Sequence, residues 1–238
     1  AVDGAGTVEC LTPIYDSIPD IEIMRQGFFS VVPYVVPGKY VAYAFSYTGG
    51  ALLQWCMETF GKGESNESME RAYGTDTPSG LLVLPHFAGA ATPYMDTGAK
   101  GAILGLTTAT TAADLYRACM EGVAYEMRLN YEALSGSGIH FTKLHATGGG
   151  AHSKVWMQMK ADVLNLPITA LKTVDAGTVG SAMLTGVAVG LFSDLRDAAA
   201  HMVQERETYY PRAEMHQNYM TIYERYKGVY SAVRPLVR

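Results

Sequence analysis

The stretch that decides the fold is residues 141–171, FTKLHATGGGAHSKVWMQMKADVLNLPITAL. Apolar and polar side chains alternate over residues 141–146, which predicts a strand, and the glycines at 148–150 predict a tight turn. Apolar residues recur at helical spacing over residues 153–164, and residues 167–171 predict a second strand. A strand, a turn, a helix and a strand in this order form a βαβ unit. We therefore expect an α/β fold with at least a partly parallel sheet.

The elements before this unit are also marked in the sequence. A threonine and an aspartate three residues apart form a capping-box-like start for an amphipathic helix over residues 111–134. Two segments rich in aromatic and β-branched residues, 28–34 and 39–47, predict a hairpin, because a Pro-Gly turn signal lies between them. Residues 51–58 predict a helix that stops at Gly61.

The remaining segments are less regular. Residues 61–80 are polar and predict a surface excursion, and residues 81–85 predict a buried strand. Residues 177–191 predict a helix with interior glycines, each of which costs about 1 kcal/mol relative to alanine. We expect the close approach of another helix or of a ligand to offset that cost. Residues 211–238 predict a polar, tyrosine-rich helix.

Composition excludes several classes of protein. The chain has 238 residues, 48% of them hydrophobic and 17% charged, which predicts one folded globular domain. The net charge is -5 and the basic residues are scattered, so nucleic acid is not an expected partner. Its three cysteines are far apart without CxxC spacing, which predicts reduced thiols in a cytoplasmic protein. No apolar run approaches the roughly 20 residues needed to span a membrane, so no membrane association is expected.

Three glycine-containing turns are candidate ligand sites. In residues 148–153, GGGAHS, a ligand could approach the backbone and meet free amides at the helix start, although the motif alone slightly favours an ordinary tight turn. Residues 3–7, DGAGT, could wrap a phosphate, or could equally be a frayed terminal hairpin. Residues 48–50, with Gln54 on the following helix, could present amides to an anion.

Other site chemistries lack their motifs. A dinucleotide fingerprint fails because Ser153 stands where its third glycine is needed, and no GxxxxGK[ST] occurs. The six histidines are dispersed without HExxH spacing, so we expect no metal site built by this chain alone. No GxSxG supports hydrolase chemistry. Glu126 falls on the apolar stripe of its helix, and we interpret it as structural.

Taken in order, these segments resemble the C-terminal half of FGGY carbohydrate kinases, particularly the xylulokinase-like branch. The resemblance covers nearly the whole chain, and its order and spacing are more specific than any single glycine turn. The matching segments are Gly6-Thr7, TGGALLQW (48–55), LP (84–85) with TPYMD (92–96), GAILGL (101–106) followed by DL (114–115) and ACMEG (118–122), GGGAHS (148–153) with Trp156, Gln158 and Ala161-Asp162, and AGTVGSA (176–182).

The resemblance implies a ribonuclease H-like domain of the actin-like ATPase architecture, with a mixed sheet and helices on both faces. It implies that residues 1–238 are the nucleotide-binding C-terminal domain of a kinase that uses ATP and Mg²⁺ to phosphorylate a sugar or polyol, with a xylulose-like pentose favoured. Residues 176–182 resemble a small-residue helix that lines the cleft between the two halves of such kinases. By position, the implied nucleotide contacts are Gly6, Thr7, Gly50, Gln54, Gly149, Gly150, Ala151 and Ser153.

The catalytic base of this family is an aspartate just upstream of the phosphate turn, and we expect it to precede residue 1. Asp3 is a poor substitute because it adjoins the turn itself. We therefore expect no catalytic residue in this chain, sugar contacts from an N-terminal domain outside it, and no phosphate transfer by the chain alone. Ala90-Ala91 departs from the Glu-Arg that is usual in the family, and Cys119 and Thr178 also differ from it. An isolated half would expose a normally buried face, through which two copies could pair as a homodimer.

Three rival interpretations remain. A regulatory module of the same fold would bind nucleotide without chemistry. An oxidoreductase domain would use the βαβ unit for NADH, against which the missing third glycine argues. An interaction module would show no nucleotide effect at all.

Overall fold

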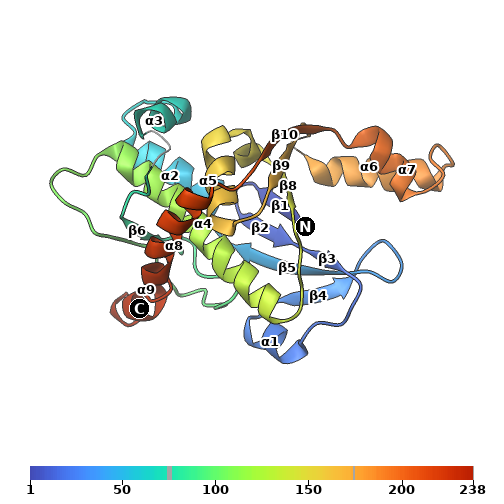
Figure 1. Ribbon diagram of the computed structural model, residues 1–238, viewed down its shortest axis with the longest axis horizontal. Helices are drawn as coiled ribbons and strands as arrows, with labels where there is room; N and C mark the ends of the chain where they lie inside the picture. The colour runs from blue at the N-terminus through green and yellow to red at the C-terminus, as the bar shows by residue number, and fades with distance from the viewer. Residues whose placement is uncertain (74–76, 174, 238) are drawn as a thin grey trace.

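The computed structural model describes residues 1–73, 77–173 and 175–237, and a mixed sheet crosses its middle (Figure 1). The strand order is β10-β9-β8-β1-β2-β5-β3, and β4 also pairs with β5. Neighbours β1, β8 and β9 run parallel, whereas the other pairs are antiparallel. The strands are β1 (Val2–Ala5), β2 (Glu9–Thr12), β3 (Ile14–Tyr15), β4 (Ser30–Pro33), β5 (Tyr40–Ser46), β8 (Leu144–Thr147), β9 (Ile168–Leu171) and β10 (Glu205–Tyr209).

The predicted βαβ unit is confirmed as β8, α5 and β9, and the predicted hairpin as β4 and β5. A second small sheet pairs β6 (Leu82–Leu84) with β7 (Ala102–Leu104). The helices are α1 (Ile21–Gln26), α2 (Gly50–Phe60), α3 (Asn66–Tyr73), α4 (Ala112–Gly136), α5 (Lys154–Leu164), α6 (Ala176–Ala188), α7 (Leu195–Met202), α8 (Ala213–Tyr226) and α9 (Val229–Val233), with 3₁₀ turns at Gly149–His152 and Arg234–Leu236.

Helix α4 is the central support of the molecule. Its predicted capping box is confirmed: the Asp114 amide donates to Thr111 Oγ1 at 3.2 Å, and the Thr111 amide donates to Asp114 Oδ2 at 2.7 Å. One side of α4 packs with α5 on the sheet through residues such as Met127 and Leu134, and another side packs against α2, α8 and β6. The helix therefore joins two apolar cores.

The arm of α6 and α7 extends away from one end of the sheet (Figure 1). An apolar groove of about 890 Å³ separates the arm from residues 34–37 of the hairpin and from Val2 of β1. The next residue of β1, Asp3, is buried. The expected close neighbour is present at Gly186, where a methyl group would lie 2.6 Å from the Phe192 ring, but among the described residues nothing lies within 4 Å of a methyl group built at Gly180.

Two segments that the sequence predicts to be polar contribute buried side chains in the structure. Residues 66–73 of the polar excursion form α3, anchored by Met69, which is only 6% exposed; residues 74–76 of that excursion lie outside the described part. The C-terminal helix α8 buries Tyr219, Tyr223 and Tyr226 rather than displaying them. In both cases the apolar surroundings come from tertiary contacts, which the polar local sequence does not predict.

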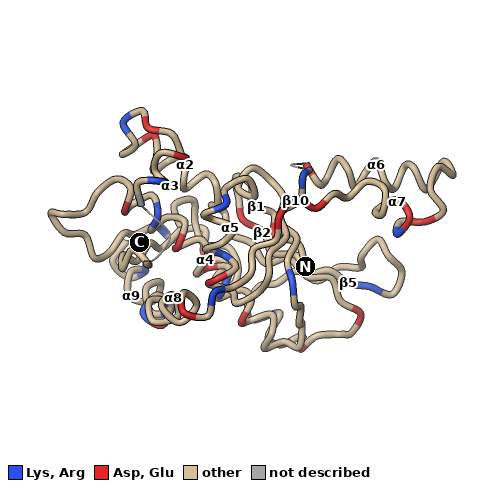
Figure 2. The backbone as a smooth tube through the Cα atoms, turned by 45° about the horizontal axis from the view of Figure 1, so that its top comes forward, with Lys and Arg blue, Asp and Glu red and all other residues tan. Residues whose placement is uncertain are grey.

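Charged side chains are spread thinly over the fold. Figure 2 shows Lys and Arg distributed along the chain, without a segment that gathers them. Across residues 1–73, 77–173 and 175–237, no helix combines the length and apolar character that crossing a membrane requires.

Candidate functional site

A cleft of about 800 Å³ lies where the β1–β2 turn, α2, α3 and the glycine turn before α5 meet. Seven of the eight residues selected from the sequence line it: Gly6, Thr7, Gly50, Gln54, Gly149, Gly150 and Ser153. These residues are up to 147 positions apart in the chain, and the fold brings them to one cavity. Their contact with a nucleotide stays a prediction.

The turn after β1 rests on the beginning of α2. The Gly50 amide donates to the Gly6 carbonyl at 2.8 Å, and the Gly49 and Ala51 amides donate to the Thr7 carbonyl at 2.9 and 3.1 Å. A methyl group on Gly50 would lie 2.8 Å from the Gly6 carbonyl oxygen, so only glycine permits this approach. The expectation that residues 48–50 present amides to an anion therefore needs correction, because the Gly49 and Gly50 amides bond the turn instead.

The turn before α5 is open toward the cleft. Gly148 has a φ of +93°. The first helical hydrogen bond of the turn runs from the Ala151 amide to the Gly148 carbonyl at 3.2 Å. The Gly149 and Gly150 amides come before this bond, so the helical pattern of the turn does not use them. None of the described residues lies within 4 Å of a methyl group built at Gly149, so this residue borders the cleft without a close neighbour among them.

Ala151 does not line the cleft, contrary to the prediction. The 3₁₀ turn points its methyl group into the core, where the residue is 3% exposed. Arg206 on β10 donates to the Ala151 carbonyl and contacts His152 Nδ1 at 2.7 Å. Ala151 thus ties the turn to β10 rather than facing a ligand.

Ser153 connects the glycine turn to a second wall. Its hydroxyl accepts the Trp156 amide at 3.0 Å, which caps α5, and donates to Glu70 Oε1 on α3 at 2.7 Å. Burial raises the pKa of Glu70, and the Ser153 hydrogen bond opposes that rise. Gln54, the other polar contact predicted from the sequence, donates to Glu58 Oε1 at 2.8 Å.

The α3 wall was missed by the sequence analysis, which interpreted residues 61–80 as a surface excursion. Asn66, Glu67 and Glu70 all line the cleft from this helix. The sequence carried little signal for them, because a short helix with one buried side chain lacks a recognisable apolar stripe.

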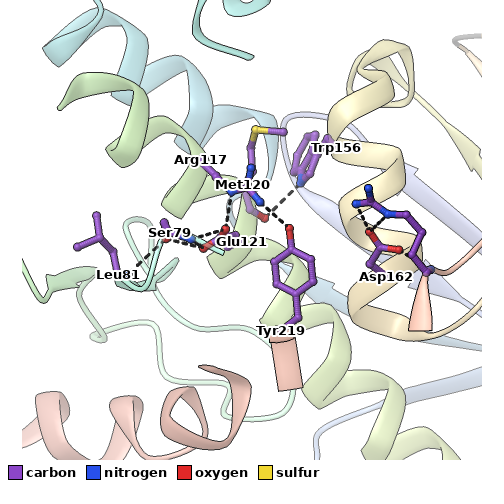
Figure 3. Close-up of polar contacts among 9 residues, drawn as sticks. Ser79, Leu81, Arg117, Met120, Glu121, Trp156, Asp162 and Tyr219 are labelled. Carbon is purple, nitrogen blue, oxygen red and sulfur yellow. Dashed lines mark hydrogen bonds and ion pairs between the residues drawn. The ribbon is translucent and has the colours of Figure 1, made fainter. Parts of the chain in front are cut away.

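The floor of the cleft is aromatic and firmly held. Trp156 is 1% exposed, and its indole Nε1 donates to the Met120 carbonyl on α4 at 3.2 Å (Figure 3). Beneath it, Arg117 bonds Glu121 at 2.8 Å and the Tyr219 hydroxyl at 3.0 Å. The Trp156 bond joins α5, and with it the glycine turn, to α4, and the Arg117 bond to Tyr219 joins α4 to α8.

The carboxylate nearest the β1–β2 turn is sequestered. Asp3 is fully buried, and its Oδ2 accepts a hydrogen bond from Lys160 Nζ at 2.9 Å. It cannot reach a ligand in the cleft. In the part of the chain that the structure describes, no three His, Cys, Asp or Glu side chains are grouped so that they could hold a metal ion.

Comparison with known proteins points to one family. The family model described as the C-terminal domain of the FGGY family of carbohydrate kinases matches residues 6–189. A xylulose kinase from Staphylococcus epidermidis is 29% identical over 203 residues, covering 84% of this chain and 41% of its own length. A glycerol kinase from Brevibacillus brevis is 35% identical over 187 residues, covering 76% of this chain and 37% of its own.

The fold is likewise shared. The crystal structure of a xyloylose kinase from Brucella ovis superposes with a TM-score of 0.87 and 25% identity, over 99% of this chain and 48% of the other. The mixed α/β class and the actin-like ATPase fold expected from the sequence are confirmed. The chain spans less than half the length of these relatives.

Proposed function

The chain belongs to the FGGY family of carbohydrate kinases, and from that premise we propose that its cleft binds ATP for phosphoryl transfer to a hydroxyl of a sugar or polyol. The observation that carries the proposal is the meeting of seven predicted contact residues, from three separate segments, around one cavity. The cavity size suits a small-molecule ligand.

Two turns would divide the work of binding. The Gly6-Thr7 turn, with its flexible backbone and hydroxyl, would contact the terminal phosphates. The Gly149-Gly150 turn, whose amides begin a helical segment, would take the adenosine together with Ser153. Apolar side chains of the cleft such as Leu53 and Met57 would exclude water from the bound nucleotide.

The other parts of the reaction are assigned outside this chain. We expect a base on an N-terminal domain to take a proton from the sugar hydroxyl, which then attacks the γ-phosphorus in line. Mg²⁺ would be held mainly by the phosphates, and we assign it no ligand here. The xylulose kinases among the relatives favour a xylulose-like pentose, and pairing of two copies and a cytoplasmic location remain part of the proposal.

Titration calorimetry of ADP and ATP, with and without Mg²⁺, tests the proposal in the purified chain. Gly149→Leu adds a side chain at a residue that lines the cleft, and the first carbon of that side chain meets none of the described residues within 4 Å. Gly136→Leu is the matched control, because a methyl group built at Gly136 also meets none of the described residues within 4 Å, but Gly136 ends α4 outside the cleft. We expect saturable binding that Gly149→Leu abolishes and Gly136→Leu preserves. Equal binding by both variants would move the nucleotide to another site.

A non-enzymatic nucleotide-binding module is the second candidate. It is favoured by the sequestration of Asp3, which leaves the β1–β2 turn without a nearby base from that residue. We expect the chain alone to form no ADP in a sugar-dependent manner. Sugar-dependent ADP formation by the pure chain would contradict this expectation.

A further inference from the structure

Three charged side chains are buried together beneath the β1–β2 turn. Lys160 on α5 donates from Nζ to Asp3 Oδ2 at 2.9 Å and to Glu9 Oε1 at 2.6 Å. The exposed fractions of the three residues are 0%, 0% and 2%. Asp3 lies in β1 just before the turn and Glu9 begins β2 just after it. One ammonium therefore joins both ends of the turn to α5.

The charges in this group balance only if it holds a proton. Burial and the Asp3 charge raise the pKa of Glu9 well above its ordinary value, while Lys160 opposes the rise. The side chains that face Glu9 from β5 and α4, Ser46 and Asn130, are neutral. A protonated Glu9 beside an Asp3–Lys160 ion pair gives a neutral group.

Burial of such a group in a core costs free energy, because its charges lose their hydration. Replacing buried ion pairs by apolar residues is often neutral or stabilising, so a role in stability alone does not account for it. In the described residues, Asp3 Oδ1 and Glu9 Oε2 have no hydrogen-bond partner. The group of Asp3, Glu9 and Lys160 carries this cost beneath a proposed ligand turn, which favours a role in positioning that turn.

Lys160 also contacts Trp156, a side chain of α5 that supports the other turn of the cleft. Its Nζ lies 4.3 Å from the centroid of the Trp156 ring, a cation–π contact. The same ring lies under the glycine turn, since a methyl group on Gly150 would come within 2.7 Å of it. The Lys160 ammonium thus contacts Asp3 and Glu9 on one side and Trp156 on the other.

We propose that Lys160 is a positioning residue that sets the β1–β2 turn at the right distance from the glycine turn, so that one nucleotide engages both. The inference rests on the proposed function. Without Lys160, the two carboxyls would repel each other or take up another proton, and the ends of the turn would move. The glycine turn would keep its other supports, the bonds of Trp156 to Met120 and of Arg206 to Ala151.

The test compares ADP with adenosine, because only ADP reports on the phosphate turn. Dissociation constants of both ligands are measured by calorimetry for the wild-type chain and for Lys160→Met. We expect the preference for ADP over adenosine to fall by about tenfold, with adenosine affinity nearly unchanged. A fall of about tenfold corresponds to the loss of one hydrogen bond between the β1–β2 turn and a charged phosphate. Lys39→Met is the control, since Lys39 also bonds an aspartate, Asp16, at 2.7 Å but is 40% exposed and far from the cleft.

The outcomes separate the two proposals. A folded Lys160→Met chain that keeps the wild-type preference for ADP would show that Lys160 is only structural. A wild-type chain that binds neither ligand would refute the proposed function and this inference with it. If Lys160→Met does not fold, Asp3→Ala replaces it, because removing one carboxyl leaves a neutral Lys160–Glu9 pair. A smaller fall in the ADP preference is expected there, and an unchanged preference in a folded Asp3→Ala chain would overturn the proposal.

Discussion

Arg117→Met should be among the most destabilising single changes in this chain. Arg117 and Glu121 are 3% and 0% exposed, and their side chains meet at 2.8 Å on α4 (Figure 3). Removing one partner of a buried ion pair typically costs about 3–5 kcal/mol, because the remaining charge is left in the interior. For a chain of this size, that corresponds to a fall in the unfolding midpoint of roughly 6–20 °C.

The loss should depend on pH in a defined direction. Burial already raises the pKa of Glu121, and Ser79 and Arg117 lower it. Without the guanidinium the folded-state pKa rises further, so the folded chain binds a proton that the unfolded chain releases. Stability of the variant should therefore fall as pH rises above the ordinary carboxyl pKa of 4.5, until Glu121 is ionised in both states.

Thermal and urea unfolding of the wild type, Arg117→Met, Glu121→Gln and the double variant measure the effect. We expect the double variant to regain most of the stability lost by Arg117→Met, because Gln carries no charge. Arg25→Met removes an exposed surface pair and should leave the midpoint nearly unchanged. A small, pH-independent loss in Arg117→Met, with no recovery in the double variant, would refute the reasoning.

Two further predictions concern packing and the C-terminal end. A methyl group on Gly122 would lie 2.4 Å from the Val83 carbonyl oxygen, so Gly122→Ala should destabilise the chain by about 1–3 kcal/mol. A methyl group on Gly180 meets none of the described residues within 4 Å, so Gly180→Ala should stabilise α6 by up to about 1 kcal/mol. Similar thermal shifts in the two variants would contradict this. The hydrogen bond from Arg234 holds the pKa of Asp96 at about 2, below its ordinary 3.8. This pair should therefore contribute fully to the free energy of unfolding above pH 3.8, and the contribution should be lost as pH falls toward 2. Urea unfolding across this range should show that component in the wild type and lack it in Asp96→Asn.

The parts of the fold that the sequence predicted are those with local signals. The turn at Gly148 needs a residue with positive φ, α4 begins with a threonine and an aspartate at capping-box spacing, and the β4–β5 hairpin has a Pro-Gly turn. Each signal acts within a few residues of the chain, so it can be recognised without knowledge of the fold. The candidate nucleotide contacts were found for the same reason, since glycine turns mark places where a ligand can approach the backbone.

The parts that were missed depend on partners distant in the sequence. Glu70 faces the cleft because Met69 anchors α3 and Ser153 meets its carboxylate, 83 residues away. Ala151 turns inward because Arg206 holds its carbonyl. The Gly49 and Gly50 amides bond the β1–β2 turn, and no pattern within residues 48–50 predicts that.

The sequence by itself therefore determined the βαβ unit, the hairpin, the start of α4, the family and the candidate ligand turns, because periodicity, caps and glycines act through the local backbone. Tertiary structure alone decided which amides remain open to a ligand and that Asp3 is sequestered. It also decided that Lys160 bonds the carboxylate of Asp3, 157 residues away. The physical reason is that burial and ion pairing depend on which segments meet, and this follows from the packing of all of them together.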